Sequence, residues 1–179
     1  MGREVRDLDE EDNGWMDAID CGSSTRPLVV CLSYANGRTA YALAIDLTAR
    51  DVQDEAKKKG LPWTIAKGFD TFCPISDPIP KCLISDPHDV ELMLQVNDKV
   101  TQSDNTGLMI FRIPRILSEI SQVMALEKGD VVLTGTPKGV GEVKAGERMG
   151  AMLRVGEKKM ATIDVNVKES QGKYEYKET

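Results

Sequence analysis

Residues 41–69, "YALAIDLTARDVQDEAKKKGLPWTIAKGF", contain an apolar segment followed directly by one rich in charged residues. The apolar residues 41–45 predict a buried β-strand. Thr48 is a suitable N-cap for the helix that follows. Lysines at 57–59, followed by Gly60, predict where that helix ends. The stretch therefore predicts a strand whose end lies directly beside the start of a helix.

Most of the other elements are predicted to be β-hairpins. Residues 28–45 contain two strands around an Asn-Gly turn signal, and residues 90–104 contain two more around an Asn-Asp turn. Alternating apolar side chains predict further strands at 150–156 and 158–169. Residues 69–89 hold four prolines and are predicted to be mostly irregular.

A second helix is predicted within residues 111–130, because its apolar residues recur at three- and four-residue spacing on one face. These residues are Ile113, Ile116, Leu117, Ile120, Val123 and Met124. The chain then has about six strands and two helices, connected mainly as hairpins. This order predicts an α+β fold that is mainly β.

The net charge of −6 is concentrated at the start of the chain of 179 residues, where residues 1–20 hold eight acids and two arginines. We expect residues 1–26 to be an acidic, disordered lead-in, residues 27–168 to be one domain, and residues 169–179 to be a polar tail. An acidic chain without a basic face argues against nucleic acid as a partner. No apolar run is long enough to span a membrane, so no membrane partner is expected. Neither an Arg-rich transit segment nor a signal peptide is visible.

The four cysteines show no CxxC pairing, and the chain has a single histidine, His88. Zinc sites usually draw their ligands from closely spaced cysteines and histidines. The cysteines are therefore interpreted as free thiols in a reducing compartment. His88, beside a proline in an irregular segment, is interpreted as a surface residue.

Asp46 is the first candidate for chemistry, because it lies at the end of a buried strand. Side chains alternate along a strand, so Asp46 shares a face with Ala42 and Ala44. A buried carboxylate is costly unless it is paired or bound to a metal. An ion pair with Arg50 is the simpler alternative to a metal or ligand site.

Four other residues are candidates for the same site. Arg50 and Gln53 lie on the first turns of the helix, where a solvated helix face is the alternative. Lys67 lies between apolar and aromatic residues and could bind an anion, although composition alone slightly favours a lysine that extends to the surface. The loop of residues 134–140, "TGTPKGV", has backbone N–H groups and hydroxyls that could bind a carboxylate, Thr136 among them. A plain turn is the alternative.

Two segments resemble the fumarylacetoacetate hydrolase superfamily. They are "AIDLTARDVQDEAKKKGLPWTIAKGFDTFCP" and "LEKGDVVLTGTPKGVG". The resemblance extends from about residue 41 to about residue 167. Within the superfamily, the chain resembles the fumarylacetoacetate hydrolase domain-containing proteins. This branch includes acylpyruvate hydrolases and oxaloacetate decarboxylase/tautomerases.

The resemblance implies a mixed β-sandwich roll of the fumarylacetoacetase C-terminal-domain type, incomplete at the N-terminus. It implies that Asp46 is a ligand to Mg²⁺ or Mn²⁺ and that Lys67 is a catalytic residue that stabilises an enolate. It implies that Arg50, Gln53, Lys67 and Thr136 bind the substrate, a small keto acid. Relatives form homodimers and are mitochondrial or cytoplasmic, so the same is expected of this chain.

The chain departs from the family upstream of Asp46. There the family has a Glu-x-Glu pair that completes the metal site, and a His with a nearby Glu that activates water. No Glu-x-Glu precedes Asp46 here, and His88 follows it. The upstream acids that we considered as replacement ligands lack the family's sequence context; they are Glu10, Asp12, Asp17 and Asp20.

Three functions follow from this comparison. The first is a metal-dependent acylpyruvate hydrolase or oxaloacetate tautomerase-decarboxylase that acts through a metal-chelated enolate. The second is a catalytically impaired, truncated relative that binds ligand or associates with full-length subunits. The third is a binding module for small molecules, without turnover.

Overall fold

The computed structural model describes residues 15–18, 23–35 and 38–169, and it describes side chains from residue 40 onward. Ten strands, three α-helices and two 3₁₀ helices make up this part of the chain. The strands are β1 (Trp15–Ala18), β2 (Ser23–Ala35), β3 (Arg38–Ala49), β4 (Ile79–Pro80), β5 (Glu91–Val96), β6 (Lys99–Asn105), β7 (Val131–Leu133), β8 (Gly141–Glu142), β9 (Arg148–Val155) and β10 (Lys158–Glu169). The helices are α1 (Arg50–Lys58), α2 (Thr64–Lys67), η1 (Lys81–Leu83), η2 (Thr106–Leu108) and α3 (Ile113–Ser121).

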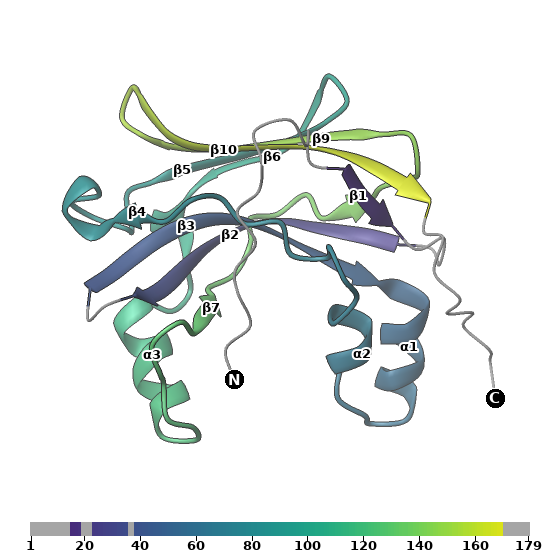
Figure 1. The fold of residues 1–179 in the computed structure, drawn as a ribbon, viewed down its shortest axis with the longest axis horizontal. Coiled ribbons are helices and arrows are strands. Elements are labelled where there is room, and N and C mark those ends of the chain that lie inside the picture. Colours follow the sequence, from purple (N-terminus) through teal and green to yellow (C-terminus); the bar gives the residue numbers. More distant parts are fainter. Residues whose placement is uncertain (1–14, 19–22, 36–37, 170–179) are drawn as a thin grey trace, which may run out of the picture.

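The strands form two sheets that stack face to face (Figure 1). The first sheet has the order β1-β10-β9-β5-β6, and the second has the order β4-β3-β2-β7, with β8 also paired to β2. All pairs are antiparallel except β1 with β10. Helices α1 and α2 and helix α3 form two separate projections on the outer side of the second sheet (Figure 1). The expected mainly β fold is confirmed, with more strands and helices than the sequence predicted.

The core lies between the sheets and is made mainly of aliphatic side chains. Those that are at most 2% exposed include Leu43, Ile45, Leu47, Leu94, Met149 and Leu153. Ala42 and Ala44 are also buried but form a separate cluster. The predicted alternation of faces along β3 is therefore confirmed, and Asp46 belongs to the face of the two alanines.

The hairpins match their predictions. β2 pairs with β3, and β5 pairs with β6 around Asn97, whose φ of 54° suits the turn. Residues 36–37, the predicted Asn-Gly turn, lie outside the described residues. The N-terminal lead-in differs from expectation, since residues 15–18 form β1 and β2 already begins at Ser23. At the other end β10 ends at Glu169, so the predicted polar tail lies outside the described residues after that point.

Helix α1 ends as predicted but begins differently. Its N-cap residue is Ala49, without a side-chain cap bond, so Thr48 as the cap was wrong. Thr48 is fully buried because it still belongs to β3. At the other end Gly60 has a φ of +65°, and Leu61 N donates to Ala56 O over 2.8 Å, as in a Schellman motif.

Helix α3 is shorter than predicted, because it ends at Ser121. Of its predicted apolar face only Ile113 is fully buried, while Val123 and Met124 lie beyond the helix and are 81% and 59% exposed. The spacing of apolar residues predicted a helix but did not show which part of it another element would cover. No helix in the described part of the chain has the length and hydrophobicity that crossing a bilayer requires.

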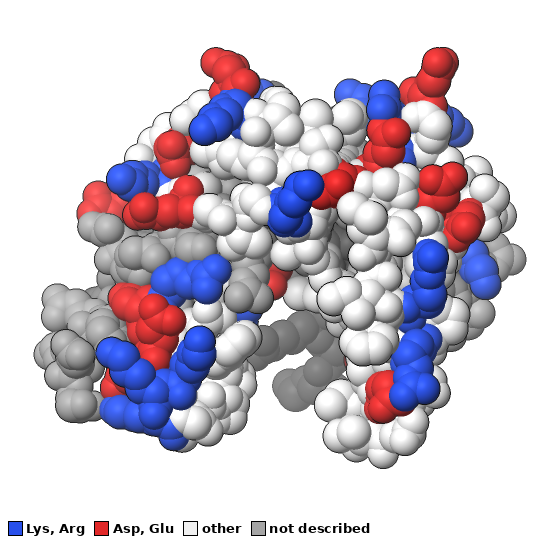
Figure 2. Space-filling view, turned by 180° about the vertical axis from the view of Figure 1, so that it is seen from behind, with Lys and Arg blue, Asp and Glu red and all other residues white. Residues whose placement is uncertain are grey.

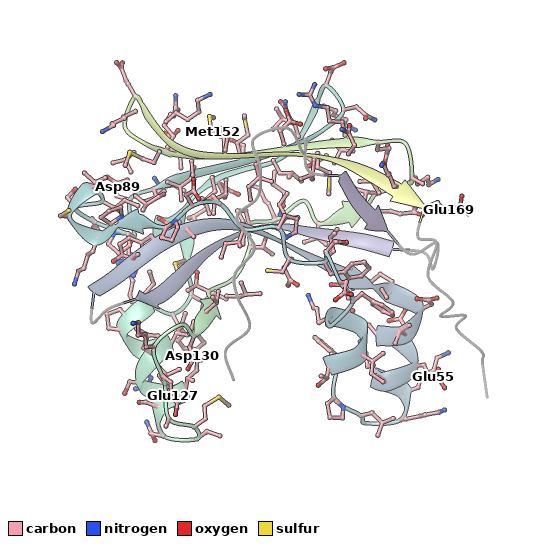
Figure 3. The ribbon with its side chains drawn as sticks, viewed as in Figure 1. Glu55, Asp89, Glu127, Asp130, Met152 and Glu169 are labelled. Carbon is pink, nitrogen blue, oxygen red and sulfur yellow. The ribbon has the colours of Figure 1, made fainter. Side chains whose placement is uncertain are left out.

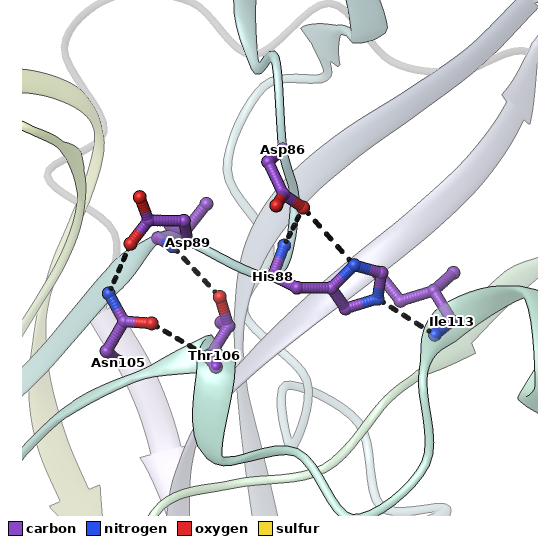
Figure 4. A network of polar contacts seen from close by, with 8 residues as sticks. Asp86, His88, Asp89, Asn105, Thr106 and Ile113 are labelled. Carbon is purple, nitrogen blue, oxygen red and sulfur yellow. Dashed lines mark hydrogen bonds and ion pairs between the residues drawn. The ribbon is translucent and has the colours of Figure 1, made fainter.

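His88 stabilises the start of α3, contrary to its interpretation as a surface residue. Its Nε2 accepts a hydrogen bond from Ile113 N over 3.1 Å, and its Nδ1 lies 3.3 Å from Asp86 Oδ1 (Figure 4). The imidazole side chain is only 15% exposed. It therefore acts in place of an N-cap side chain, because Arg112 at the cap position makes no such bond.

We expect His88→Ala to lower the free energy of unfolding by about 1 kcal/mol, the usual cost of losing a helix cap. Urea unfolding followed by circular dichroism measures this change. Asp89→Ala is the control, since Asp89 lies next to His88 and the substitution removes an exposed hydrogen bond from Asn105 at the end of β6 (Figure 4). An equal loss in both variants would show that the bond to Ile113 contributes nothing specific.

Candidate active site

Asp46 and Lys67 form an ion pair at the end of β3. Lys67 Nζ donates to Asp46 Oδ2 over 2.5 Å. The two side chains are 26% and 19% exposed, so the pair is largely but not fully removed from solvent. The alternative partner for Asp46 was wrong, because Arg50 hydrogen-bonds to Gln53 instead. The alternative interpretation of Lys67, a lysine that extends to the surface, was also wrong, because its ammonium group is paired with Asp46.

The segment after α2 explains why Lys67 reaches β3. Ala66, next to Lys67, is 1% exposed and belongs to the core cluster. Beyond α2 the chain runs along β3, where Leu47 N donates to Phe72 O and Ile45 N donates to Pro74 O, both over 2.9 Å. Buried Phe72 fixes this segment further. Contacts on both sides thus hold α2 against the strand that carries Asp46.

Arg50 and Gln53 lie together on the first turn of α1. Arg50 Nη1 donates to Gln53 Oε1 over 2.9 Å. Gln53 is 3% exposed, and its Nε2 has no hydrogen-bond partner among the described residues. A buried amide donor without a partner is costly and usually has a reason. A ligand that accepts this hydrogen bond would supply one.

Cys73 is a neighbour of the ion pair that the sequence did not indicate. Cys73 is an exposed residue, and partial desolvation of its thiol raises the pKa of that group. The charge of Asp46 raises the pKa to a lesser degree, while Lys67 acts in the opposite direction. Both charges therefore act on this sulfur. The sequence carried no signal for this, because Cys73 lies in a proline-rich irregular segment.

The loop of residues 134–140 joins β7 to β8, which both pair with β2. Leu133 pairs with Cys31, and Gly141 pairs with Thr25. The loop therefore runs along residues 26–30 of β2, whose other neighbour is the part of β3 that ends with Asp46. Thr136 itself lies against β6 of the other sheet, because its Oγ1 is 3.2 Å from Gln102 Nε2.

A cavity of about 440 Å³ lies beside this loop. Thr136 lines it, but Asp46 and Lys67 do not. Most of its other walls are apolar: Leu92, Leu108, Met109, Ile110, Phe111 and Ile116. The surface is also hollowed between the projection of α1 and α2 and that of α3 (Figure 2).

The described residues do not make a complete site for a divalent metal. They contain no group of three or more His, Cys, Asp or Glu side chains arranged to hold an ion. The neighbouring strand β2 has no Asp or Glu in its sequence, and its register places Arg26 opposite Asp46. The carboxylates Asp89, Glu127 and Asp130 lie on the α3 side of the molecule, far from α1 and α2 (Figure 3). Mg²⁺ prefers several oxygen ligands, and the part of the chain that the structure describes does not gather three such side chains around an ion.

Of the upstream acids considered as ligands, only Asp17 lies on a described element. Its strand β1 pairs with β10 at the edge of the first sheet, whereas Asp46 lies in the second sheet. Glu10, Asp12 and Asp20 lie outside the described residues.

Comparison with known proteins identifies the class. A model of the family described as "Fumarylacetoacetate (FAA) hydrolase C-terminal" matches residues 39–172. The chain therefore belongs to the fumarylacetoacetate hydrolase family, and the resemblance seen in the sequence is confirmed.

Individual relatives narrow the comparison. The mitochondrial oxaloacetate tautomerase oaa1 of Schizosaccharomyces pombe is 55% identical over 121 residues, which are 68% of this chain and 55% of that protein. This chain thus spans about half the length of the curated relatives it matches.

Two solved structures are similar in fold. Yeast ynq8, a fumarylacetoacetate hydrolase family protein, has a TM-score of 0.85 and 36% identity over 92% of this chain and 76% of its own. Fumarylpyruvate hydrolase of Pseudomonas aeruginosa, in complex with Mn²⁺ and pyruvate, has a TM-score of 0.76 and 27% identity over 87% of this chain and 72% of its own.

Proposed function

We propose that this chain acts on small keto acids as an oxaloacetate tautomerase, with Lys67 as the catalytic residue. The observation that carries the proposal is the partly buried ion pair of Lys67 with Asp46. Gln53 adds a buried Nε2 donor that has no hydrogen-bond partner among the described residues. Support also comes from the S. pombe relative, which is named as an oxaloacetate tautomerase. The similarity of the P. aeruginosa enzyme supports acylpyruvate-type substrates as a second class.

The proposed chemistry places negative charge next to Lys67. Tautomerisation moves a proton from the carbon beside the ketone to the ketone oxygen, through an enolate. An ammonium group in a site with little water stabilises that oxygen more than bulk solvent does. Asp46 orients the ammonium group through its 2.5 Å hydrogen bond. Lys67 would therefore contribute most when the enolate forms.

The other candidate residues would hold the substrate. Gln53 Nε2 is a donor without a partner among the described residues, which suits a carboxylate or ketone oxygen. Arg50 lies against Gln53 and adds positive charge. Thr136, on its loop, would bind a carboxylate of the substrate.

Tautomerisation fits this chain better than hydrolysis of a C–C bond. Hydrolysis needs a base that activates water, and histidine is the most frequent choice. His88 is the chain's single histidine, and its ring bonds to Ile113 N at the start of α3. A tautomerase needs no activated water. Of the activities grouped in the first function, tautomerisation of oxaloacetate is therefore favoured over hydrolysis.

The test is to follow the disappearance of the enol form of oxaloacetate with and without the purified chain. Enzymatic tautomerisation predicts a rate that rises in proportion to the concentration of chain. A rate equal to the spontaneous one at every concentration would overturn the proposal. It would favour the alternative of an impaired relative that binds ligand or associates with full-length subunits.

We also propose that Asp46 binds Mg²⁺ or Mn²⁺, as the Mn²⁺ complex of the P. aeruginosa relative suggests. Among the described residues no group of three or more His, Cys, Asp or Glu side chains is arranged to hold an ion with it. We therefore expect weak binding, with a Kd of about 1 mM, because few charged ligands hold the ion. Titration of Mn²⁺ followed by electron paramagnetic resonance should show this binding, and Asp46→Asn should abolish it. Asp77→Asn, at an exposed position, is the control, and equal binding by the Asp46 variant would contradict the assignment.

Two further proposals concern the location of the chain in the cell and its oligomeric state. The S. pombe relative is named as mitochondrial, which supports a mitochondrial location here. A homodimer, expected from the family resemblance, remains a proposal that sedimentation at several concentrations can test.

A further inference from the structure

Gln102 joins the first sheet to the loop that contains Thr136. It lies on β6 and is 2% exposed. Its Nε2 lies 3.2 Å from Thr136 Oγ1 and 2.6 Å from Pro137 O. One buried amide group thus contacts two successive residues of a loop that belongs to the other sheet.

The partners fix the orientation of the amide. A carbonyl oxygen can only accept a hydrogen bond, so the group facing Pro137 O must be the NH₂ of Gln102. The same NH₂ then donates to Thr136 Oγ1. The hydroxyl oxygen of Thr136 is thereby used as an acceptor, and its own proton must point away from Gln102. This bond fixes the position of the hydroxyl in the loop.

A bulge in β6 brings Gln102 to this position. Val100 pairs with Gln95 and Gln102 pairs with Leu94, so Thr101 is the extra residue between them. A bulge redirects the side chain that follows it. The same bulge presents the carbonyl of Thr101 to Gly139, where a Cβ would lie only 2.2 Å from the oxygen. Two adjacent residues of β6, Thr101 and Gln102, therefore pack closely against the loop.

Burial of the Gln102 amide costs free energy, so its presence at this position needs an explanation other than core stability. Its Oε1 is buried and has no hydrogen-bond partner among the described residues. An apolar residue of the same size would avoid this cost. The amide is thus better suited to fixing the loop than to stabilising the core.

We infer that Gln102 is a positioning residue, which holds the loop and keeps the Thr136 hydroxyl in the place where a substrate carboxylate would bind. This inference rests on the proposed function for the role of Thr136. Gln102 itself does not touch the substrate. It acts on substrate binding through the hydroxyl.

The experiment compares Gln102→Met with the wild type and with Gln95→Met, the same substitution on the neighbouring strand. Methionine keeps the length of the side chain without its donor. We expect amide exchange in residues 134–140 to become about tenfold faster in Gln102→Met only, because the loop loses two hydrogen bonds. KM for oxaloacetate should rise by about tenfold with kcat nearly unchanged, as when ground-state binding is lost.

Combination with Thr136→Val tests whether the two residues act together. In that background Gln102→Met should raise KM no further, since the hydroxyl that it holds in place is gone. A purely structural role would instead give the same added loss in both backgrounds. Gln102→Glu is a second variant, which should weaken substrate binding at least as much because its carboxylate cannot donate a hydrogen bond to Pro137 O.

The outcomes separate this inference from the proposed function. Turnover by the wild type, with exchange and KM unchanged in Gln102→Met, overturns the role of Gln102 and leaves the function intact. Absence of turnover, with oxalate binding that Gln102→Met weakens, overturns the function and supports the role of Gln102. Absence of both turnover and oxalate binding in the wild type overturns both.

Discussion

Lys67→Met is expected to lower kcat/KM for oxaloacetate tautomerisation by about 10³-fold, the upper range for losing one donor to a developing oxyanion. Methionine has a similar length but cannot place positive charge beside the enolate. The loss should appear mainly in kcat, because the charge develops only as the reaction proceeds. Steady-state kinetics followed by enol absorbance measures it.

Lys59→Met is the matched control, because it removes a lysine from the exposed ion pair with Glu55 on α1. We expect its kinetics to equal those of the wild type. The Lys67 variant should also lose stability by about 1–2 kcal/mol, since Asp46 keeps its burial without its partner. Alkylation of Cys73 gives an independent reading, because loss of the nearby lysine charge raises the pKa of the thiol further and slows the reaction. Full activity in Lys67→Met would remove the catalytic role of this residue.

Gly139→Ala is expected to have the largest effect on stability, about 3 kcal/mol of the free energy of unfolding. Gly139 has a φ of +98°, a conformation that strains any other residue. The new Cβ would also lie 2.2 Å from the carbonyl oxygen of Thr101 on β6. Backbone must therefore move, and the contact between the loop and β6 would open.

Gly129→Ala separates these two causes. Gly129 has a φ of +99°, but a Cβ there would meet nothing within 4 Å. We expect this variant to lose only about 1 kcal/mol, the cost of the backbone conformation alone. Urea unfolding of both variants gives the difference, which is the cost of the clash. Equal losses would mean that the loop is not held tightly against β6.

The strand and helix of residues 41–69 could be predicted because their signals are local. Alternation of side chains placed Asp46 on the face of the two alanines of β3, and Gly60 marked the end of α1. The predicted start of α1 was wrong. Thr48 has a side chain suited to an N-cap, but β3 continues through this residue to Ala49. Pairing with β2 through residue 49 decided this, and the segment itself does not encode it.

The partners of polar residues depended on contacts distant in sequence. Arg50 is close to Asp46 in sequence and was the predicted alternative partner for an ion pair. The structure instead pairs Asp46 with Lys67, which is 21 residues away in sequence. Gln102 gave no signal, because the bulge at Thr101 reverses the alternation that would have put it on the solvent face. His88 likewise found its partner at the start of α3, 25 residues further on.

The sequence by itself determined the family, the mainly β fold and the residue types of the candidate site. Local periodicity, turn chemistry and two long motifs were enough for that. The tertiary structure alone decided which side chains meet: Lys67 with Asp46, Gln102 with the Thr136 loop, and α1 and α2 as a projection separate from α3. The reason is physical, since a buried polar group bonds to the partner that the packing of distant elements brings within reach.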